Sequence, residues 1–333
     1  MKPRQPGPWR PLGGWFSRGA AAFWLAFGIT SCRGAEVRLT PLPSGAQAVS
    51  LLGDTLWNVP LPPGEGPGLV AKLHSAQRNL SVRPTDAGAK LLVARRTAAL
   101  GRLRDAVSIY SEVIADDFGT ARVYRRRGDL LLQLREMAAA ERDLRRSATD
   151  PAGTGVRDYS EDSSGGLIGS LVRYQASLGL GVVRYVGGDY SRAASHLLAA
   201  LKISEGADEL AESGLWLSFA LRRAGRASEA GQVIRGIPGD LAVQHRAAEL
   251  SLLRLFRGDI GLDSIRLQAV QGGPENEALF MYGLGFVQLA RGDTVGAAET
   301  LQQVLDLGNW PSRAFIAAEA DLARIRLGRK PRR

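Results

Sequence analysis

The stretch LGRLRDA, at residues 100–106, places a glycine five positions before an alanine, between two helical segments. Four further stretches repeat the arrangement: VGGDYSRA at 186–193, AGRASEA at 224–230, RGDIGLD at 257–263 and RGDTVGA at 291–297. Glycine adopts the left-handed conformation that ends a helix at no steric cost. Each stretch therefore predicts a first helix that stops, turns and is followed by a second.

The last residue of each stretch marks one repeat, and a sixth marker follows Arg135, which stands where the other units have glycine. The markers are Ala106, Ala140, Ala193, Ala230, Asp263 and Ala297, at steps of 34, 53, 37, 33 and 34 residues. A period in this range is typical of a solenoid, in which stacked helix pairs share one core. Such stacks expose a long surface that usually binds polypeptide.

Two further positions support the same register. Seven residues before the turn stands a small side chain that allows close helix approach: Ala94, Gly128, Gly181, Ser218, Ser251 and Gly285. Four residues after the marker stands a bulky apolar one: Tyr110, Leu144, Leu197, Ile234, Leu267 and Leu301. A spacing of four puts marker and bulky residue on one face of the second helix.

These positions resemble the tetratricopeptide repeat (TPR) family, with its small residue, alanine and aromatic or leucine at set places. The resemblance covers roughly residues 87–327 and is carried by all six units together. It implies an all-α fold, a right-handed TPR-like α-solenoid of about six helix pairs plus a capping helix.

The spacing also predicts the domain boundaries. Units one and two occupy residues 87–150, and units three to six occupy 171–311. The long step between them leaves a Gly/Ser-rich insertion at 151–170, expected to loop out because its composition cannot bury a core. Capping helices are expected at 68–86 and 312–328, with a basic tail at 329–333. Residues 32–67 form a flexible Pro-rich tether, in which only the apolar piece Val49–Trp57 could dock on the repeats.

Residues 1–31 have the pattern of a secretion signal. Four basic residues and no acids precede the apolar run Ala20–Ile29, which is too short to span a bilayer. The following residues, Ile29 to Cys32, resemble a lipobox. That resemblance implies cleavage before Cys32 and a lipid on its thiol, hence an exported, membrane-anchored lipoprotein. With Arg33 in place of aspartate, it implies the periplasmic side of the outer membrane in a diderm host. Alternatively, Cys32 is incidental to an ordinary cleavage site.

No pattern of a catalytic, metal or cofactor site stands out. The three histidines occur singly, and the one cysteine cannot form a disulfide within the chain. The glycine pairs at 179–181 and 283–285 fall at close-packing positions of the repeats rather than in a nucleotide-binding loop. The net charge of +10 comes from basic residues interspersed with acids. We therefore expect no enzyme, no cofactor, no small-molecule substrate and no nucleic-acid partner.

The resemblance also implies where a ligand would bind, because first helices line the concave face in TPR-like stacks. Units one and two place there the basic residues Arg95, Arg122 and Arg125. Units three to six place there Tyr185, Phe219, Phe256, Tyr282 and Phe286, with Arg222 and Arg223 between them. One interpretation is a groove with a basic entrance and an aromatic floor, suited to an extended or helical peptide with acidic groups. The other is that the arginines are solvated and the aromatic rings are core.

Two functions remain open on the sequence. The first is a non-catalytic scaffold that is exported, lipid-anchored and binds a partner protein or peptide through its concave face. The second is a structural accessory subunit of an envelope, secretion or polysaccharide-export assembly. The sequence itself identifies no partner.

Overall fold

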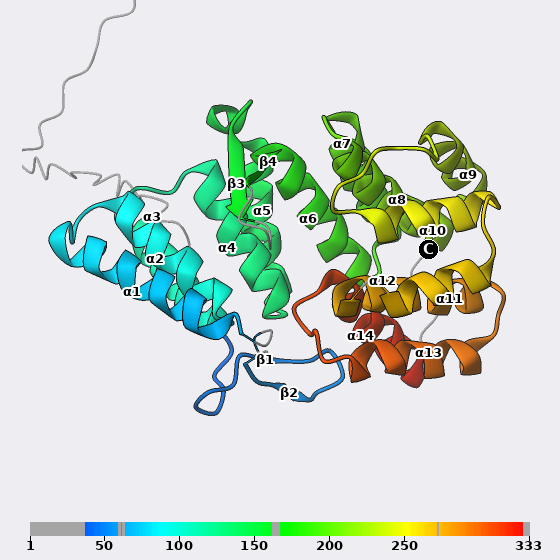
Figure 1. Ribbon diagram of the computed structural model, residues 1–333, viewed down its shortest axis with the longest axis horizontal. Helices are drawn as coiled ribbons and strands as arrows, with labels where there is room; N and C mark the ends of the chain where they lie inside the picture. Colours follow the sequence, from blue (N-terminus) through cyan, green and yellow to red (C-terminus); the bar gives the residue numbers. More distant parts are fainter. Residues whose placement is uncertain (1–36, 59–60, 62–63, 162–166, 272, 329–333) are drawn as a thin grey trace, which may run out of the picture. The chain divides into compact units, whose positions relative to one another are not determined.

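The computed structural model describes residues 37–58, 61, 64–161, 167–271 and 273–328. The expected signal peptide, Cys32 and the basic tail at 329–333 lie outside the described residues. Within the described part, helices dominate, as the repeat pattern predicts (Figure 1).

Six consecutive helix pairs form the repeats. They are α2 (Ala87–Ala99) with α3 (Leu103–Ala115), α4 (Ala121–Gln133) with α5 (Met137–Thr149), α6 (Val172–Val186) with α7 (Tyr190–Lys202), α8 (Ala207–Arg223) with α9 (Ala227–Gly236), α10 (Ala247–Arg257) with α11 (Leu262–Gln271), and α12 (Gly273–Ala290) with α13 (Thr294–Asp306). One helix precedes them, α1 (Gly66–Val82), and one follows, α14 (Arg313–Arg326). The all-α fold of six pairs with a helix at each end is confirmed.

The turn positions behave as their sequence predicts. Backbone φ is positive at every turn glycine, with 73° at Gly101, 80° at Gly188, 76° at Gly225, 91° at Gly258 and 82° at Gly292. Arg135 takes the same conformation at 63°, although a side chain there carries a steric cost. The helix reversal is therefore the same in the second unit as in the others.

The close-packing positions meet the bulky residues of the same unit. A Cβ atom on Gly128 would lie 2.7 Å from Cγ of Leu144, and one on Gly285 would lie 2.9 Å from Cδ2 of Leu301. Gly181 meets Leu197 in the same way. The five alanine markers are fully buried. The predicted register is thus correct in these units.

The fifth unit is an exception, and its predicted register is wrong. The side chain of Asp263 is 98% exposed, and Leu267 is also exposed. In unit one the second helix begins two residues after the turn glycine, at Leu103, whereas α11 begins four residues after Gly258. The longer turn moves the buried position by two residues, and Ile265 is fully buried.

The insertion forms a short β-hairpin, where the sequence predicted only a surface loop. A 3₁₀ turn at Pro151–Gly153 leads into β3 (Arg157–Glu161), which pairs antiparallel with β4 (Leu167–Leu171). Asp158 lies opposite Ser170 in this ladder. The insertion is therefore more ordered than the surface loop that its composition predicted, because ion pairs between Asp158 of β3 and the arginines of α4 hold it.

The segment 37–58 is docked along the repeats, which corrects the expectation of a free tether there. It contains a second small hairpin, β1 (Ala48–Val49) with β2 (Thr55–Leu56), drawn in blue below α1 and α14 in Figure 1. Gln47 Oε1 accepts a hydrogen bond of 2.9 Å from the Leu103 amide at the start of α3. The Trp310 indole donates 2.8 Å to the Trp57 carbonyl. The predicted docking of Val49–Trp57 is confirmed.

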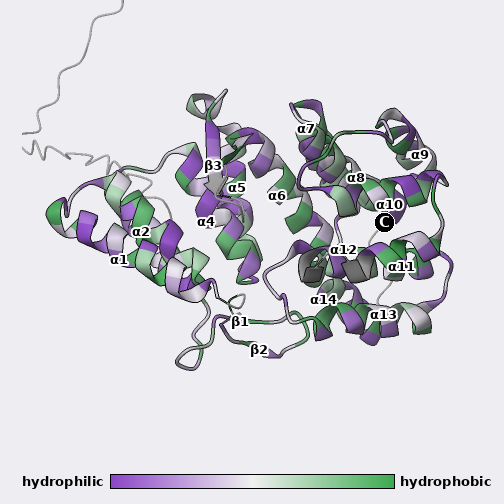
Figure 2. Ribbon diagram, in the orientation of Figure 1, coloured by the Kyte–Doolittle hydropathy of each residue, from purple (hydrophilic) through white to green (hydrophobic). Residues whose placement is uncertain are grey.

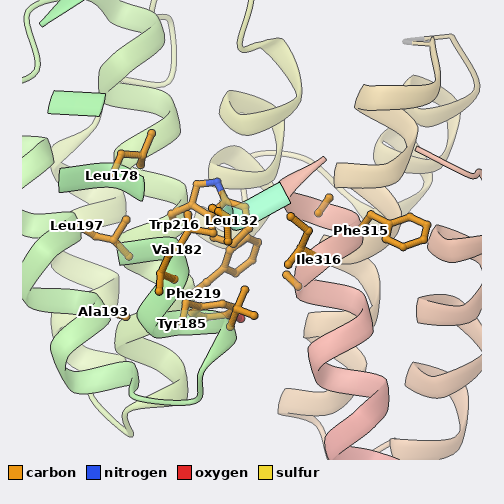
Figure 3. Packing of buried hydrophobic residues seen from close by; sticks show 14 of the residues in the cluster. Leu132, Leu178, Val182, Tyr185, Ala193, Leu197, Trp216, Phe219, Phe315 and Ile316 are labelled. Carbon is orange, nitrogen blue, oxygen red and sulfur yellow. The ribbon is translucent and has the colours of Figure 1, made fainter. Parts of the chain in front are cut away.

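The core continues across the inner faces of the repeats. Residues 314–322 of α14 are buried without interruption, so this helix is covered on all sides. It packs against α13 and α12 and also against α6, three units earlier. Figure 3 shows Tyr185, Trp216 and Phe219 gathered with Ile316 of α14 in one cluster. The last helix therefore closes the inner face as well as capping the stack.

None of the helices in the described ranges is both long and apolar enough to span a membrane.

Candidate functional site

The predicted aromatic residues lie together, but in the core. Tyr185 and Phe219 are fully buried, and so is Tyr282, while Phe286 is 3% exposed. The rings of Phe219 and Phe286 are 4.6 Å apart, and the Tyr185 and Tyr282 hydroxyls are hydrogen-bonded at 2.6 Å. The expectation of an exposed aromatic floor is wrong in this structure, and the core interpretation describes these rings.

Phe256 and Arg222 lie at the border of this cluster. Phe256 is half-buried and meets Phe219 edge to face, with ring centroids 5.7 Å apart. The Arg222 guanidinium stacks over the Phe256 ring at 5.3 Å. Burial lowers the pKa of Arg222. The pair is a packing contact at the edge of the core.

Three ion pairs hold α14 against the inner helices. Arg313 at its start pairs with Glu212 of α8. In its middle, Glu319 pairs with Arg135 at 2.9 Å, and Asp321 pairs with Arg223 of α8 at 2.5 Å. All three acids are at most 7% exposed at the side chain. Glu212 also pairs with Arg246, and Asp321 also pairs with Arg324, so these two acids each contact two arginines. Breaking the Arg135 pair would leave the buried charge of Glu319 without its arginine partner.

Glu319 joins three distant segments at one point. Its carboxylate receives both the Arg135 guanidinium and the backbone amide of Leu51, the latter at 3.3 Å. Arg135 also donates 2.9 Å to the Trp310 carbonyl. Burial raises the pKa of Glu319, although Arg135 acts to lower it. Sequence patterns could not reveal this site, because its groups are far apart along the chain.

Two of the predicted basic residues, Arg122 and Arg125, form a separate cluster with Arg126 on α4. Arg122, Arg125 and Arg126 lie at spacings of three and four, on one face of the helix. All three surround the carboxylate of Asp158 from β3, which is 4% exposed at the side chain. Arg126 Nη2 lies 2.7 Å from Asp158 Oδ1, and Arg122 Nε lies 3.6 Å from it. Arg125 contacts Asp158 directly and Asp129 at 2.7 Å.

Backbone groups of β3 complete this contact. Arg122 donates 2.6 Å to the carbonyl of Arg157, and Arg126 donates 2.8 Å to that of Tyr159. Figure 2 shows β3 as a mainly hydrophilic strand beside α4. The arginine face of α4 thus holds an extended segment through one acidic side chain and two carbonyl groups.

Arg95 of α2 belongs to the same electrostatic neighbourhood. It is exposed, and its charge acts on both Arg126 and the buried Tyr110. Burial first, then the adjacent charge of Arg125, lowers the pKa of Arg126 to about 10. The guanidinium therefore remains charged at neutral pH. The structure brings Arg122 and Arg125 together at Asp158 and adds Arg126, for which the run Arg125–Arg127 was the available signal.

Arg127 in the same run has an internal role. Its guanidinium forms a bidentate pair with Asp143 of α5, at 2.6 and 2.9 Å, and is 2% exposed. No group of His, Cys, Asp and Glu side chains among the described residues could hold a metal ion.

A comparison with protein families agrees with the repeat architecture of the first two units. Residues 93–154 match the family model described as tetratricopeptide repeat. A solved structure of a tetratricopeptide repeat protein from Parabacteroides merdae is similar at 14% identity and a TM-score of 0.46, covering 77% of this chain and 92% of that one. No curated protein is significantly similar in sequence.

Proposed function

We propose that this chain, which carries tetratricopeptide repeats, is an exported and lipid-anchored scaffold that binds a partner protein through the basic face of its first two units. The TPR architecture supports a role in protein–protein interaction without catalysis. The observation that carries the choice of surface is the burial of α14. Because this helix covers the aromatic rings of the later units, the exposed side chains of Arg95 and Arg122 in the first two units support the choice of the basic face.

The membrane part of the proposal rests on the amino-terminal sequence. The basic leader, the short apolar run and the lipobox-like residues before Cys32 together favour acylation of that thiol. Arg33 favours the outer membrane if the host is diderm. In this arrangement the partner would be an envelope protein, met on the periplasmic side.

A structural accessory role is the second candidate, and the closed inner face favours it. A subunit whose last helix is held in place by three ion pairs to buried acidic residues is suited to a permanent assembly. Its outward surfaces would then make the contacts, with a fixed number of subunits in the complex.

Charge reversal at the basic face tests the first candidate. The double variant Arg95→Glu/Arg122→Glu should lose its partner in a crosslinked pull-down from membranes, and the wild-type capture should weaken as salt rises. Arg192→Glu is the matched control, because Arg192 is 70% exposed on α7, away from α4. A salt-resistant complex of fixed stoichiometry that survives the double variant would support the structural role instead. In the same preparations, Cys32→Ser should release the chain from membranes if the thiol is acylated.

A further inference from the structure

We propose that the β3–β4 hairpin occupies its own chain's recognition site, and that the partner presents an extended segment with an internal Asp or Glu in place of Asp158. This inference rests on the proposed function and specifies the partner's chemistry. In the structure described here, the site is closed by the chain itself.

The contact between the α4 arginines and β3 uses groups that another peptide could supply. The α4 arginines bind β3 through one side-chain carboxylate and the carbonyls of Arg157 and Tyr159. Carbonyl groups are present in any peptide, whereas the carboxylate requires an acidic residue. A strand from another protein with one Asp or Glu can therefore make every one of these contacts.

The arginine groups in this cluster outnumber the carboxylates that they contact. Three guanidinium groups converge on Asp158, and Arg125 must also serve Asp129. Within the described ranges, Arg125 Nε is buried without a hydrogen-bond partner. Arg122 keeps 47% of its side chain exposed, and Arg95 adds a further charge. The cluster therefore retains positive charge with which to attract an acidic segment.

The hairpin has contacts with the repeats other than those of Asp158. Its face toward solvent exposes Tyr159 at 47% and Leu167 at 71%, whereas Leu171 at its base packs against the core. On the other strand, Ser170 Oγ donates 2.5 Å to Glu209 of α8. The amide of Val172, where α6 begins, donates 2.9 Å to the Val156 carbonyl. These contacts would keep the hairpin attached after Asp158 leaves the arginines, so exchange need not unfold the repeats.

A peptide copied from this chain supplies the probe. Fluorescently labelled GVRDYS, the sequence of residues 155–160, would be titrated into the full chain and followed by anisotropy. Asp158→Asn should free the arginines and lower the Kd for the peptide about tenfold or more relative to wild type, because the competing occupant is weakened. Asp263→Asn is the matched control and should bind like wild type, since its side chain is 98% exposed. The same peptide with Asn in place of Asp should bind weakly to all three proteins.

Equal peptide affinity for wild type and Asp158→Asn would overturn the inference, as would equal binding of the Asn peptide. If the variant proves poorly folded, hydrogen exchange on wild type decides. Excess GVRDYS should speed exchange of the β3 amides, while the Asn peptide should not, and unchanged protection would count against displacement. If the peptide does not bind while capture of the partner from membranes still depends on Arg95 and Arg122, the inference about the hairpin is wrong and the proposed function stands. Peptide binding without any captured partner would refute the proposed function instead.

Discussion

Arg135 both forms the turn of its own repeat and contacts residues near and in the last helix. Its position demands the left-handed conformation that the other units give to glycine. A side chain there costs about 1–2 kcal/mol in backbone strain. The same side chain reaches Glu319 and Trp310, 184 and 175 residues away along the chain. A glycine would suit the turn better, so the arginine is explained by the contact with the last helix.

Removing Arg135 should therefore destabilise the chain despite relieving strain. In Arg135→Gly the buried Glu319 loses its partner, a loss of about 3–5 kcal/mol, and the relaxed turn returns about 1–2 kcal/mol. We expect a net loss of about 1–4 kcal/mol in the free energy of unfolding, measured with urea. Adding Glu319→Gln to this variant should recover much of that loss, since no charge then remains buried. A double variant no more stable than Arg135→Gly would show that the ion pair does not fix α14.

At the scale of the elements, the repeats were predictable because each unit follows from residues close in sequence. Turn glycine, marker and bulky residue lie within one helix pair, and their burial matches the pattern in every unit but the fifth. The register predicted for the fifth unit was wrong because its turn is two residues longer. A fixed spacing cannot account for a longer turn. The β3–β4 hairpin and the docking of residues 37–48 were missed for another reason. Both are held by hydrogen bonds and ion pairs with distant residues, such as Asp158 with α4 and Gln47 with α3.

Enlarging a buried marker tests the helix-pair packing. Ala297→Leu should overpack the contact between α13 and α12 and lower the free energy of unfolding by about 1–3 kcal/mol. Asp263→Leu, at the corresponding sequence position of the fifth unit, should change it by no more than about 0.5 kcal/mol, because that side chain is exposed. Thermal or urea unfolding monitored by circular dichroism would measure both. Similar losses in the two variants would mean that the register assigned to unit five is wrong.

Over the described part of the molecule, the candidate site differs in one main respect from the site predicted from the sequence. Arg122 and Arg125 were expected to be neighbours, and both contact Asp158. The aromatic rings expected on the same face contact one another in the core. What the pattern could not show is that α14 returns to α6 and seals those rings, because this contact joins units that are not adjacent in sequence. A groove open along all six units is thus reduced to a basic surface on the first two, with the chain's own hairpin upon it.

Site-specific photocrosslinking tests this central claim most directly. A photoreactive amino acid would replace Arg95 in one variant and Phe286 in another, and membranes would be irradiated with the partner in place. We expect a covalent adduct with another protein from position 95 and none from position 286, since Phe286 is 3% exposed. An adduct from position 286 without one from position 95 would show that the partner enters between α12 and α14. That result would contradict a sealed inner face.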